Sequence, residues 1–276
     1  TVANAENVVI EDLTVDGRGV TTGVAGSNPN HAGVFYRNSS GGLENVDVTG
    51  VRDPYEPGMT AGGAPIVSGL QRGVGVQADN DAGPLKSFFM TGGSITDFQK
   101  NATVFGYADL SITGVTVTGG GAQTINAQNG FQAFNSSGSI SGNTITEIGF
   151  AGAAFAYSGA ILGFDNTDLN IENNIITGTN DETLDAKVVG VFIFDDGLGN
   201  SGGAVSGNTI SFVDTGVGIY GLIGPSQISV TNNTVTDLDI TDPFAAGVDH
   251  QPNAGATINF QITGSGVQDS LFGSDQ

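Results

Sequence analysis

The sequence predicts an all-β protein built as a solenoid, in which one strand-containing unit repeats along the chain and its copies stack on each other. Three observations predict this class. A short motif recurs at intervals of 22 to 47 residues, β-branched residues alternate with polar ones around it, and no stretch has the periodicity of an amphipathic helix. Because the repetition covers the whole chain, we expect a single elongated domain instead of two compact ones.

The repeated motif is clearest at 139–145, Ser-Ile-Ser-Gly-Asn-Thr-Ile. Each copy places an asparagine three residues after one β-branched residue and two residues before another. We expect the asparagines to stack at a turn and to hydrogen-bond to one another, because buried backbone groups there need partners. Close copies hold Asn143, Asn174, Asn208 and Asn233, and looser copies begin at Ile10, Leu43, Met90, Ile112 and Thr257. These nine anchors predict a solenoid of about nine to ten rungs.

A second strand follows each motif, and it begins with glycine and then alternates. Examples are Gly-Val-Phe-Ile-Phe at 190–194 and Gly-Val-Gly-Ile-Tyr at 216–220. Successive side chains on a strand point to opposite faces, so the residue after the glycine and every second one beyond it should face inward. We therefore expect two strands per repeat. The outward row contains Arg37, Gln77, Phe134, Phe164, Phe194, Tyr220 and Gln251.

Composition and charge limit the partners. The chain of 276 residues has 45 glycines, no cysteine and a formal net charge of −21, and six of its seven basic residues lie in the first 100 positions. Such a surface repels nucleic acid and anionic membranes, and no apolar run reaches the roughly 20 residues of a membrane helix. We expect neither nucleic-acid binding nor membrane insertion. The acidic clusters are chemically suited to Ca²⁺.

The ends of the chain suggest how it is organised. It begins at Thr1 without a signal peptide and enters a strand almost at once. We interpret it as a mature or excised piece of a longer bacterial protein that is extracellular or on the cell surface. Residues 1–263 should form the solenoid. The Gly- and Asp-rich tail 264–276 resembles the start of a Ca²⁺-binding nonapeptide repeat.

The repeating Ile-Ser-Gly-Asn-Thr-Ile pattern resembles the right-handed parallel β-helix superfamily over residues 8–263. That superfamily includes pectate and alginate lyases, mannuronan epimerases, phage tailspikes and bacterial surface proteins. In its enzymes the polysaccharide lies along an outward sheet face, and a Lys, Arg, His or Tyr base acts beside a uronate carboxylate that Arg or Ca²⁺ neutralises. Asp53-Pro-Tyr-Glu56 resembles an epimerase segment, with Tyr55 where that family has histidine.

Candidate catalytic residues are basic and lie at the entry to the second strand in successive rungs: His31, Arg72 and Lys100. Proton abstraction next to a carboxylate needs a base and a positive group that stabilises the developing charge. Together with Arg37 and Gln77 these groups would form a strip, which we expect to face an open groove if the protein is an enzyme. The alternative is that they are solvated basic residues at strand ends.

The outward aromatic residues Phe134, Phe164, Phe194 and Tyr220 predict an aromatic stripe. It could stack sugars, pack against another subunit, or be covered by a loop, because a soluble protein seldom leaves such a patch bare. Asp165, Asp195 and Asp196 follow the rings and are candidate Ca²⁺ ligands.

Two functions from different classes therefore remain open. The first is an extracellular structural or adhesive module, or a filament or surface-layer subunit, that binds carbohydrate or self-associates along the stripe. The alternative is a lyase or epimerase acting on an acidic polysaccharide. The scarcity of basic residues after Lys100 and the lack of a complete catalytic motif favour the non-catalytic function.

Overall fold

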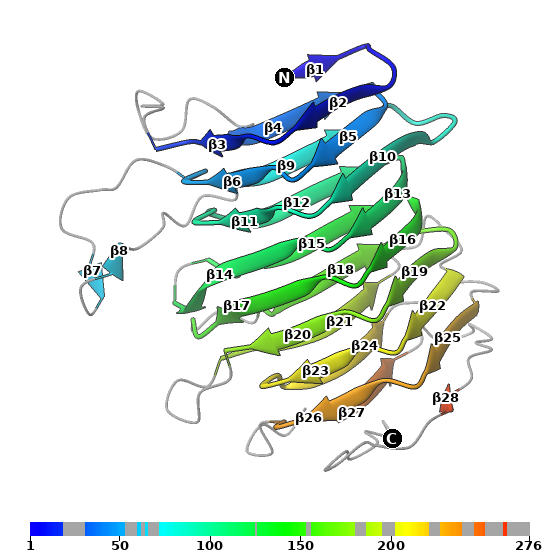
Figure 1. Cartoon of the computed structure of the whole chain (residues 1–276). Helices are drawn as coiled ribbons and strands as arrows, with labels where there is room; N and C mark the ends of the chain where they lie inside the picture. The colour runs from blue at the N-terminus through cyan, green and yellow to red at the C-terminus, as the bar shows by residue number, and fades with distance from the viewer. Residues whose placement is uncertain are drawn as a thin grey trace.

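The computed structural model describes residues 1–18, 31–52, 60–61, 64–65, 72–124, 126–152, 156–179, 186–194, 202–220, 227–238, 246–251 and 262–263. These residues form three long parallel sheets that run along one stack of rungs (Figure 1). The chain passes from sheet 1 to sheet 2 to sheet 3 and then starts the next rung, so strands adjacent in a sheet are separated by a full turn of the chain. The predicted solenoid is confirmed.

Within the described part of the chain, sheets 1 and 2 contain nine strands each and sheet 3 contains eight. In spatial order, sheet 1 consists of β1 (Val2–Ala3), β4 (Ala32–Arg37), β9 (Val74–Asp79), β12 (Asn101–Gly106), β15 (Asn129–Phe134), β18 (Ser158–Phe164), β21 (Val188–Phe194), β24 (Thr215–Tyr220) and β27 (Ala246–Gln251). Sheet 2 consists of β2 (Val8–Glu11), β5 (Gly41–Glu44), β10 (Lys86–Thr91), β13 (Ala108–Thr113), β16 (Ser137–Ser141), β19 (Leu169–Glu172), β22 (Gly202–Ser206), β25 (Gln227–Thr231) and β28 (Ile262–Thr263).

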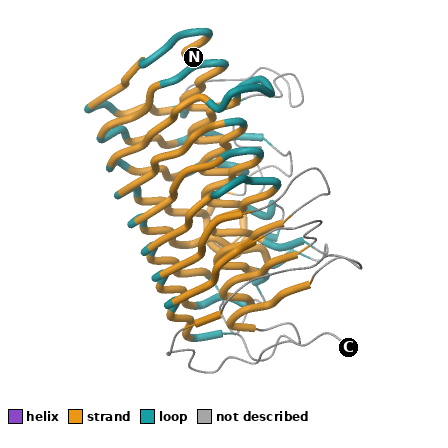
Figure 2. The backbone as a smooth tube through the Cα atoms, turned by 90° about the vertical axis from the view of Figure 1, so that its right-hand side faces the viewer, coloured by secondary structure: helices purple, strands orange, loops and turns teal. Residues whose placement is uncertain are grey.

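Sheet 3 consists of β3 (Thr14–Asp16), β6 (Asp47–Thr49), β11 (Ser94–Thr96), β14 (Thr116–Gln123), β17 (Thr144–Phe150), β20 (Ile175–Gly178), β23 (Thr209–Ser211) and β26 (Thr234–Thr236). Each rung therefore has three strands, and the expectation of two was wrong. The repeated motif bends at its asparagine and contributes the end of one strand and the start of the next, for example β16 and β17. Figure 2 shows the rungs stacked one upon another.

The bend between sheets 2 and 3 explains why the motif reads Gly-Asn or Asn-Asn. The residue before each ladder asparagine has a positive φ: 65° at Gly142, 55° at Asn173, 66° at Gly207 and 55° at Asn232. Glycine enters this left-handed region without steric cost, and asparagine tolerates it better than most residues. The local sequence thus fixes the corner in every rung.

The predicted asparagine ladder forms at this corner. Asn174 Oδ1 accepts hydrogen bonds from Asn143 N and Asn143 Nδ2, both at 3.0 Å, and Asn174 Nδ2 donates to Ile140 O at 2.9 Å. Asn208 and Asn233 repeat these contacts in the following rungs. The ladder satisfies buried backbone groups, so its role is structural.

The core fills the space between the three sheets. Its largest fully buried side chains include Tyr36, Phe88, Phe105, Phe131, Ile112, Ile140 and Ile145. Small residues lead the strands of sheet 1 because β-branched side chains of sheet 3 leave no room there. A Cβ at Gly190 would lie 2.6 Å from Ile210 Cγ2, and one at Gly216 would lie 2.7 Å from Val235 Cγ2. Packing therefore explains why these strands start with glycine.

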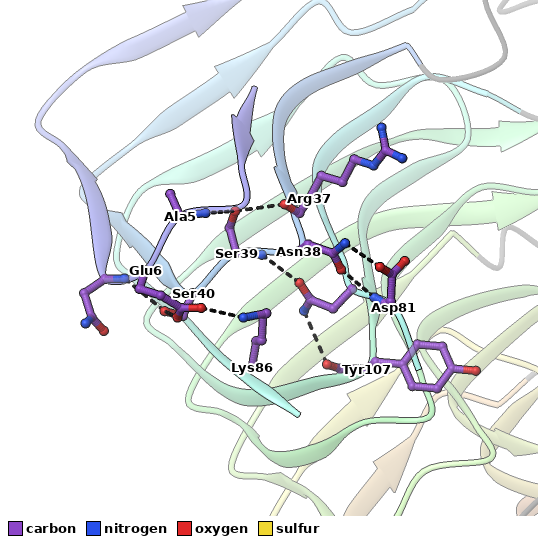
Figure 3. A network of polar contacts seen from close by, with 11 residues as sticks. Ala5, Glu6, Arg37, Asn38, Ser39, Ser40, Asp81, Lys86 and Tyr107 are labelled. Atoms are coloured by element: carbon purple, nitrogen blue, oxygen red, sulfur yellow. Dashed lines mark hydrogen bonds and ion pairs between the residues drawn. The ribbon is translucent and has the colours of Figure 1, made fainter. Parts of the chain in front are cut away.

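A polar network attaches the first rung to the stack (Figure 3). Lys86 Nζ donates to Glu6 Oε1 at 2.5 Å, and Ser40 Oγ donates to the other oxygen of Glu6. These contacts, with the Lys86 bond first, lower the pKa of Glu6. Asn38 Nδ2 donates to Asp81 Oδ2 at 2.5 Å in the same region. The contacts join residues that are far apart in sequence and hold the rung in place.

The long interval after Leu43 contains a short antiparallel pair, β7 (Thr60–Ala61) and β8 (Ala64–Pro65), which Figure 1 draws beside the stack. This pair belongs to the loop expected at 51–65. Asp53-Pro-Tyr-Glu56 lies outside the described residues. Within the described part of the chain no helix is long and apolar enough to cross a membrane.

Candidate functional site

The aromatic stripe forms on the outer face of sheet 1. Phe134 pairs with Phe164, Phe164 with Phe194, and Phe194 with Tyr220 in successive strands, so the four residues occupy one outward row as expected. The Phe134 and Phe164 rings are stacked, with centroids 5.4 Å apart and planes 10° apart. Phe194 is 38% exposed. We call these four residues the aromatic row.

Two further residues, not singled out from the sequence, form a second outward row beside the aromatic row. Phe192 lies two residues before Phe194 on the same strand and therefore on the same face. Its ring meets Tyr220 edge-on, with centroids 5.1 Å apart, and Phe194 at 6.4 Å. Leu162 pairs with Phe192 in the next strand and widens the apolar surface. The alternation of Phe192 and Phe194 was a sequence signal that could have identified this second row.

Polar groups border the aromatic row at its C-terminal end. Tyr220 Oη donates a hydrogen bond of 2.5 Å to Asp249 Oδ2. Burial, followed by the bond to Asp249, raises the pKa of Tyr220 well above its usual range, so the hydroxyl stays protonated. The row thus ends at a phenol hydroxyl whose partner carboxylate is buried, since Asp249 is 8% exposed.

Arg37 and Gln77 do not share one row. Arg37 pairs with Asp79, and Gln77 pairs with Phe35, so Gln77 belongs to the neighbouring outward row. The sequence alone did not place Gln77 correctly, because Arg72-Gly-Val-Gly-Val contains two Gly-Val steps and either could start the strand. The register aligns the second step, at Gly75, with Gly33, whereas we had expected the first, at Gly73. Arg37 is exposed and lies on the same outward line as the aromatic row, toward the N-terminal end of the stack.

The same shift in strand register changes how the basic residues of the predicted strip are aligned. Ala32 pairs with Val74 and Val74 pairs with Asn101, so the residues directly before them, His31, Gly73 and Lys100, share one position in successive rungs. Arg72 lies one residue earlier. The three basic residues are brought to one corner of the stack, between sheets 3 and 1, but not into one row.

We expected this strip to face an open groove, but His31 and Arg72 are each only 7% exposed. His31 Nε2 has no hydrogen-bond partner among the described residues. Lys100 is half-buried and its Nζ donates to Ala127 O. Burial lowers the pKa of Lys100 to about 8 because the ammonium loses hydration. The catalytic assignment of the three residues stays a prediction.

Buried amides surround Lys100 and were not predicted as a group. Asn129 Nδ2 donates to Asn101 Oδ1 at 3.0 Å, and Asn129 Oδ1 accepts from Gly159 N at 3.0 Å. Gln128 Nε2 donates to Phe98 O at 2.7 Å. These amides form a second short ladder at the corner where sheet 1 begins. The signal in the sequence was that β12 and β15 each begin with an asparagine followed by a small residue.

The calcium prediction involves Asp165, Asp195 and Asp196. Asp165 is 4% exposed and has a φ of 53° at the corner after β18. Asp195 and Asp196 lie outside the described residues, as does the tail 264–276. Among the residues that the structure describes, no group of three or more His, Cys, Asp or Glu side chains could hold a metal ion. Calcium binding stays a prediction.

Three stacked parallel sheets with internal ladders define the class of β-solenoid proteins. A family model described as the right-handed beta helix region matches residues 72–260, more than half of the chain. The protein therefore belongs to the right-handed β-helix family, as the resemblance implied. Comparison with curated proteins and with solved structures gave no significant match.

Proposed function

We propose that the protein is a non-catalytic module of the cell surface or extracellular space that binds a carbohydrate chain along the aromatic row. The single observation that carries this proposal is the alignment of four aromatic residues on one outward line of sheet 1. Phe194 is exposed and the other three residues are half-exposed, and an accessible apolar patch on a protein surface marks a binding site. Because the strands are spaced by about 4.8 Å, the row is about 14 Å long, which suits an extended polymer lying along the stack.

The negative charge of the protein favours a neutral polysaccharide as the partner over an acidic polysaccharide or a second copy of the protein. The net charge of −21 repels an acidic polysaccharide and also repels a second copy of the protein. A neutral sugar experiences no such repulsion. It also presents both C–H faces, which pack on rings, and hydroxyl groups, which can donate to the Tyr220 oxygen while that oxygen donates to Asp249.

Affinity electrophoresis on gels containing neutral or acidic polysaccharides tests this proposal, with light scattering on the same samples. Retardation by a neutral polysaccharide is expected, and Phe164→Ser and Phe194→Ser should abolish it. Phe212→Ser is the matched control, because Phe212 is 46% exposed but lies outside the row. Rising scattering that the two row variants prevent would instead identify a self-association face. If the protein shows neither retardation nor rising scattering, the proposal is refuted.

One observation favours a second candidate, the lyase or epimerase. A general base works best when its pKa is near the operating pH, and that of Lys100 is lowered to about 8. The ultraviolet absorbance of unsaturated uronate, followed on acidic polysaccharides with and without Ca²⁺, tests it. Absorbance that grows with time and is lost in Lys100→Ala would establish a lyase. We expect no increase, because His31 and Arg72 are buried.

A further inference from the structure

The outer face of sheet 3 carries an array of side chains that bear a hydroxyl group at eleven of twelve positions, the exception being the exposed Ile175. In each of its last six strands two outward residues flank one buried β-branched residue, as Thr144 and Thr146 flank Ile145. The register aligns these positions from strand to strand. We call the set the threonine array: Ser94, Thr96, Thr116, Thr118, Thr144, Thr146, Ile175, Thr177, Thr209, Ser211, Thr234 and Thr236.

The array is periodic in two directions. Neighbouring strands of a sheet are about 4.8 Å apart, and residues two apart on a strand are separated by about 6.7 Å. The irregularity between β14 and β17 lies after Thr118, so it leaves the array in register. Threonine is stiff at χ1, so its hydroxyl and methyl groups are held in place before any ligand arrives. The array is a preformed two-dimensional lattice, unlike the single line of the aromatic row.

The array is uncharged on a strongly acidic protein. None of its twelve positions is Asp or Glu, although the chain has 28 acidic residues. The two earlier strands of the sheet do carry outward Asp16 and Asp47. Farther along the stack, acids lie at the turn that follows the array, for example at Asp97, Glu147 and Asp237, which are all exposed. A rim of charge therefore borders a neutral face.

We propose that the threonine array binds ice. The two repeats of the array are close to the oxygen repeats on faces of hexagonal ice, hydroxyl groups can occupy or anchor lattice oxygens, and methyl groups fit the spaces between them. Charged side chains orient water in ways that disagree with the lattice, which matches their exclusion from this face. The array holds no aromatic ring, so it is less suited to stacking the sugars of a crystalline polysaccharide.

Most hydroxyls of the array are available for this purpose. The exceptions lie on its first strand, where Ser94 Oγ donates to Asp47 Oδ1 at 2.6 Å and Thr96 Oγ1 donates to Thr49 Oγ1 at 3.1 Å. Thr146 Oγ1 makes only long contacts, 3.4 Å to Val117 O and 3.5 Å to Thr118 Oγ1. In the other line of the array, which also contains Ser94 and Ile175, the four threonines Thr116, Thr144, Thr209 and Thr234 make no side-chain hydrogen bond within the described part of the chain. Water can therefore bond to them without displacing a protein contact.

Nanolitre osmometry on the purified full chain tests the proposal by measuring crystal shape and the gap between melting and freezing temperatures. The protein should shape ice and open a measurable gap. Thr144→Tyr, in the middle of the array, should remove most of the gap. Ser139→Tyr is the matched control, because Ser139 lies outward on sheet 2 in the same rung, and it should leave the gap unchanged.

Circular dichroism melting of both variants establishes that they are folded. Three results would overturn the proposal: unshaped ice with folded wild-type protein, equal ice activity in wild type and Thr144→Tyr, or adsorption to a crystalline polysaccharide powder without any effect on ice. The aromatic row is unchanged in both variants, so this test and the carbohydrate test fail independently.

Discussion

Replacing Asn174 by alanine should destabilise the protein strongly, because this side chain bonds to both neighbouring rungs. It is fully buried. Its Oδ1 accepts from Asn143 N at 3.0 Å, and its Nδ2 donates to Ile140 O at 2.9 Å and to Asn208 Oδ1 at 3.0 Å. Alanine removes all of these contacts.

The magnitude follows from the groups that lose their partners. Asn143 N and Ile140 O are buried backbone groups that bond to the Asn174 side chain, whereas Asn143 Nδ2 keeps Ile112 O and Asn208 Oδ1 keeps Asn174 N. An unsatisfied buried group costs about 1–3 kcal/mol, so two of them should lower the free energy of unfolding by about 4 kcal/mol. A loss of this size is exceptional for a single substitution.

Urea unfolding followed by circular dichroism and tyrosine fluorescence measures this loss. Coincident transitions with an unchanged slope are required, because repeat proteins can unfold in stages. Asn170→Ala is the matched control: Asn170 is half-buried four residues away, and among the described residues its side chain makes one hydrogen bond, of 3.5 Å, to Asp168 O. The control should change stability by about 0.5 kcal/mol or less. A loss in Asn174→Ala no larger than in the control would refute the ladder argument.

Three further predictions concern single side chains. The pKa of Lys100 is lowered from 10.5 to about 8, so the unfolded state binds more protons between these values; stability should rise with pH there, and urea unfolding of Lys100→Met should not show the rise. Gly142 has a φ of 65° with no atom closer than 3.8 Å to an added Cβ, so Gly142→Asn should be tolerated and Gly142→Val should cost about 1–2 kcal/mol more in thermal unfolding. Tyr36 Oη donates to Val8 O at 2.9 Å or Gly42 O at 3.0 Å, so calorimetry should find Tyr36→Phe less stable by about 1–3 kcal/mol, and no loss would exclude this role.

The sequence was sufficient for the features that every rung must repeat. Stacking four asparagines requires the same residue at the same corner, so Asn143, Asn174, Asn208 and Asn233 stand out without a structure. The aromatic row was also predictable, because Phe164, Phe194 and Tyr220 follow an unambiguous glycine-led strand. Both predictions depend only on spacing within a rung.

Features that depend on the register between rungs were harder to predict. Two Gly-Val steps around Gly73 and Gly75 fit the pattern equally well, and only packing of Gly75 against Ile95 and the backbone of the next rung selects the second. This choice moved Gln77 to another row and Arg72 out of line with His31 and Lys100. Burial of basic side chains at that corner was likewise not predictable, since it depends on three sheets meeting.

The inner and outer positions of the rungs evolve under different physical constraints, which explains why one fold carries two dissimilar surfaces. An inward residue such as Ile145 must match its neighbours in volume, because cores are close-packed. An outward residue such as Thr146 or Phe164 needs only to be compatible with a β-strand, so its chemistry is free to vary from sheet to sheet. Each added rung repeats that chemistry once more along a rigid line, and many weak contacts then act together without further loss of freedom. On this reasoning the affinity of either face depends on the number of uninterrupted rungs more than on any single residue.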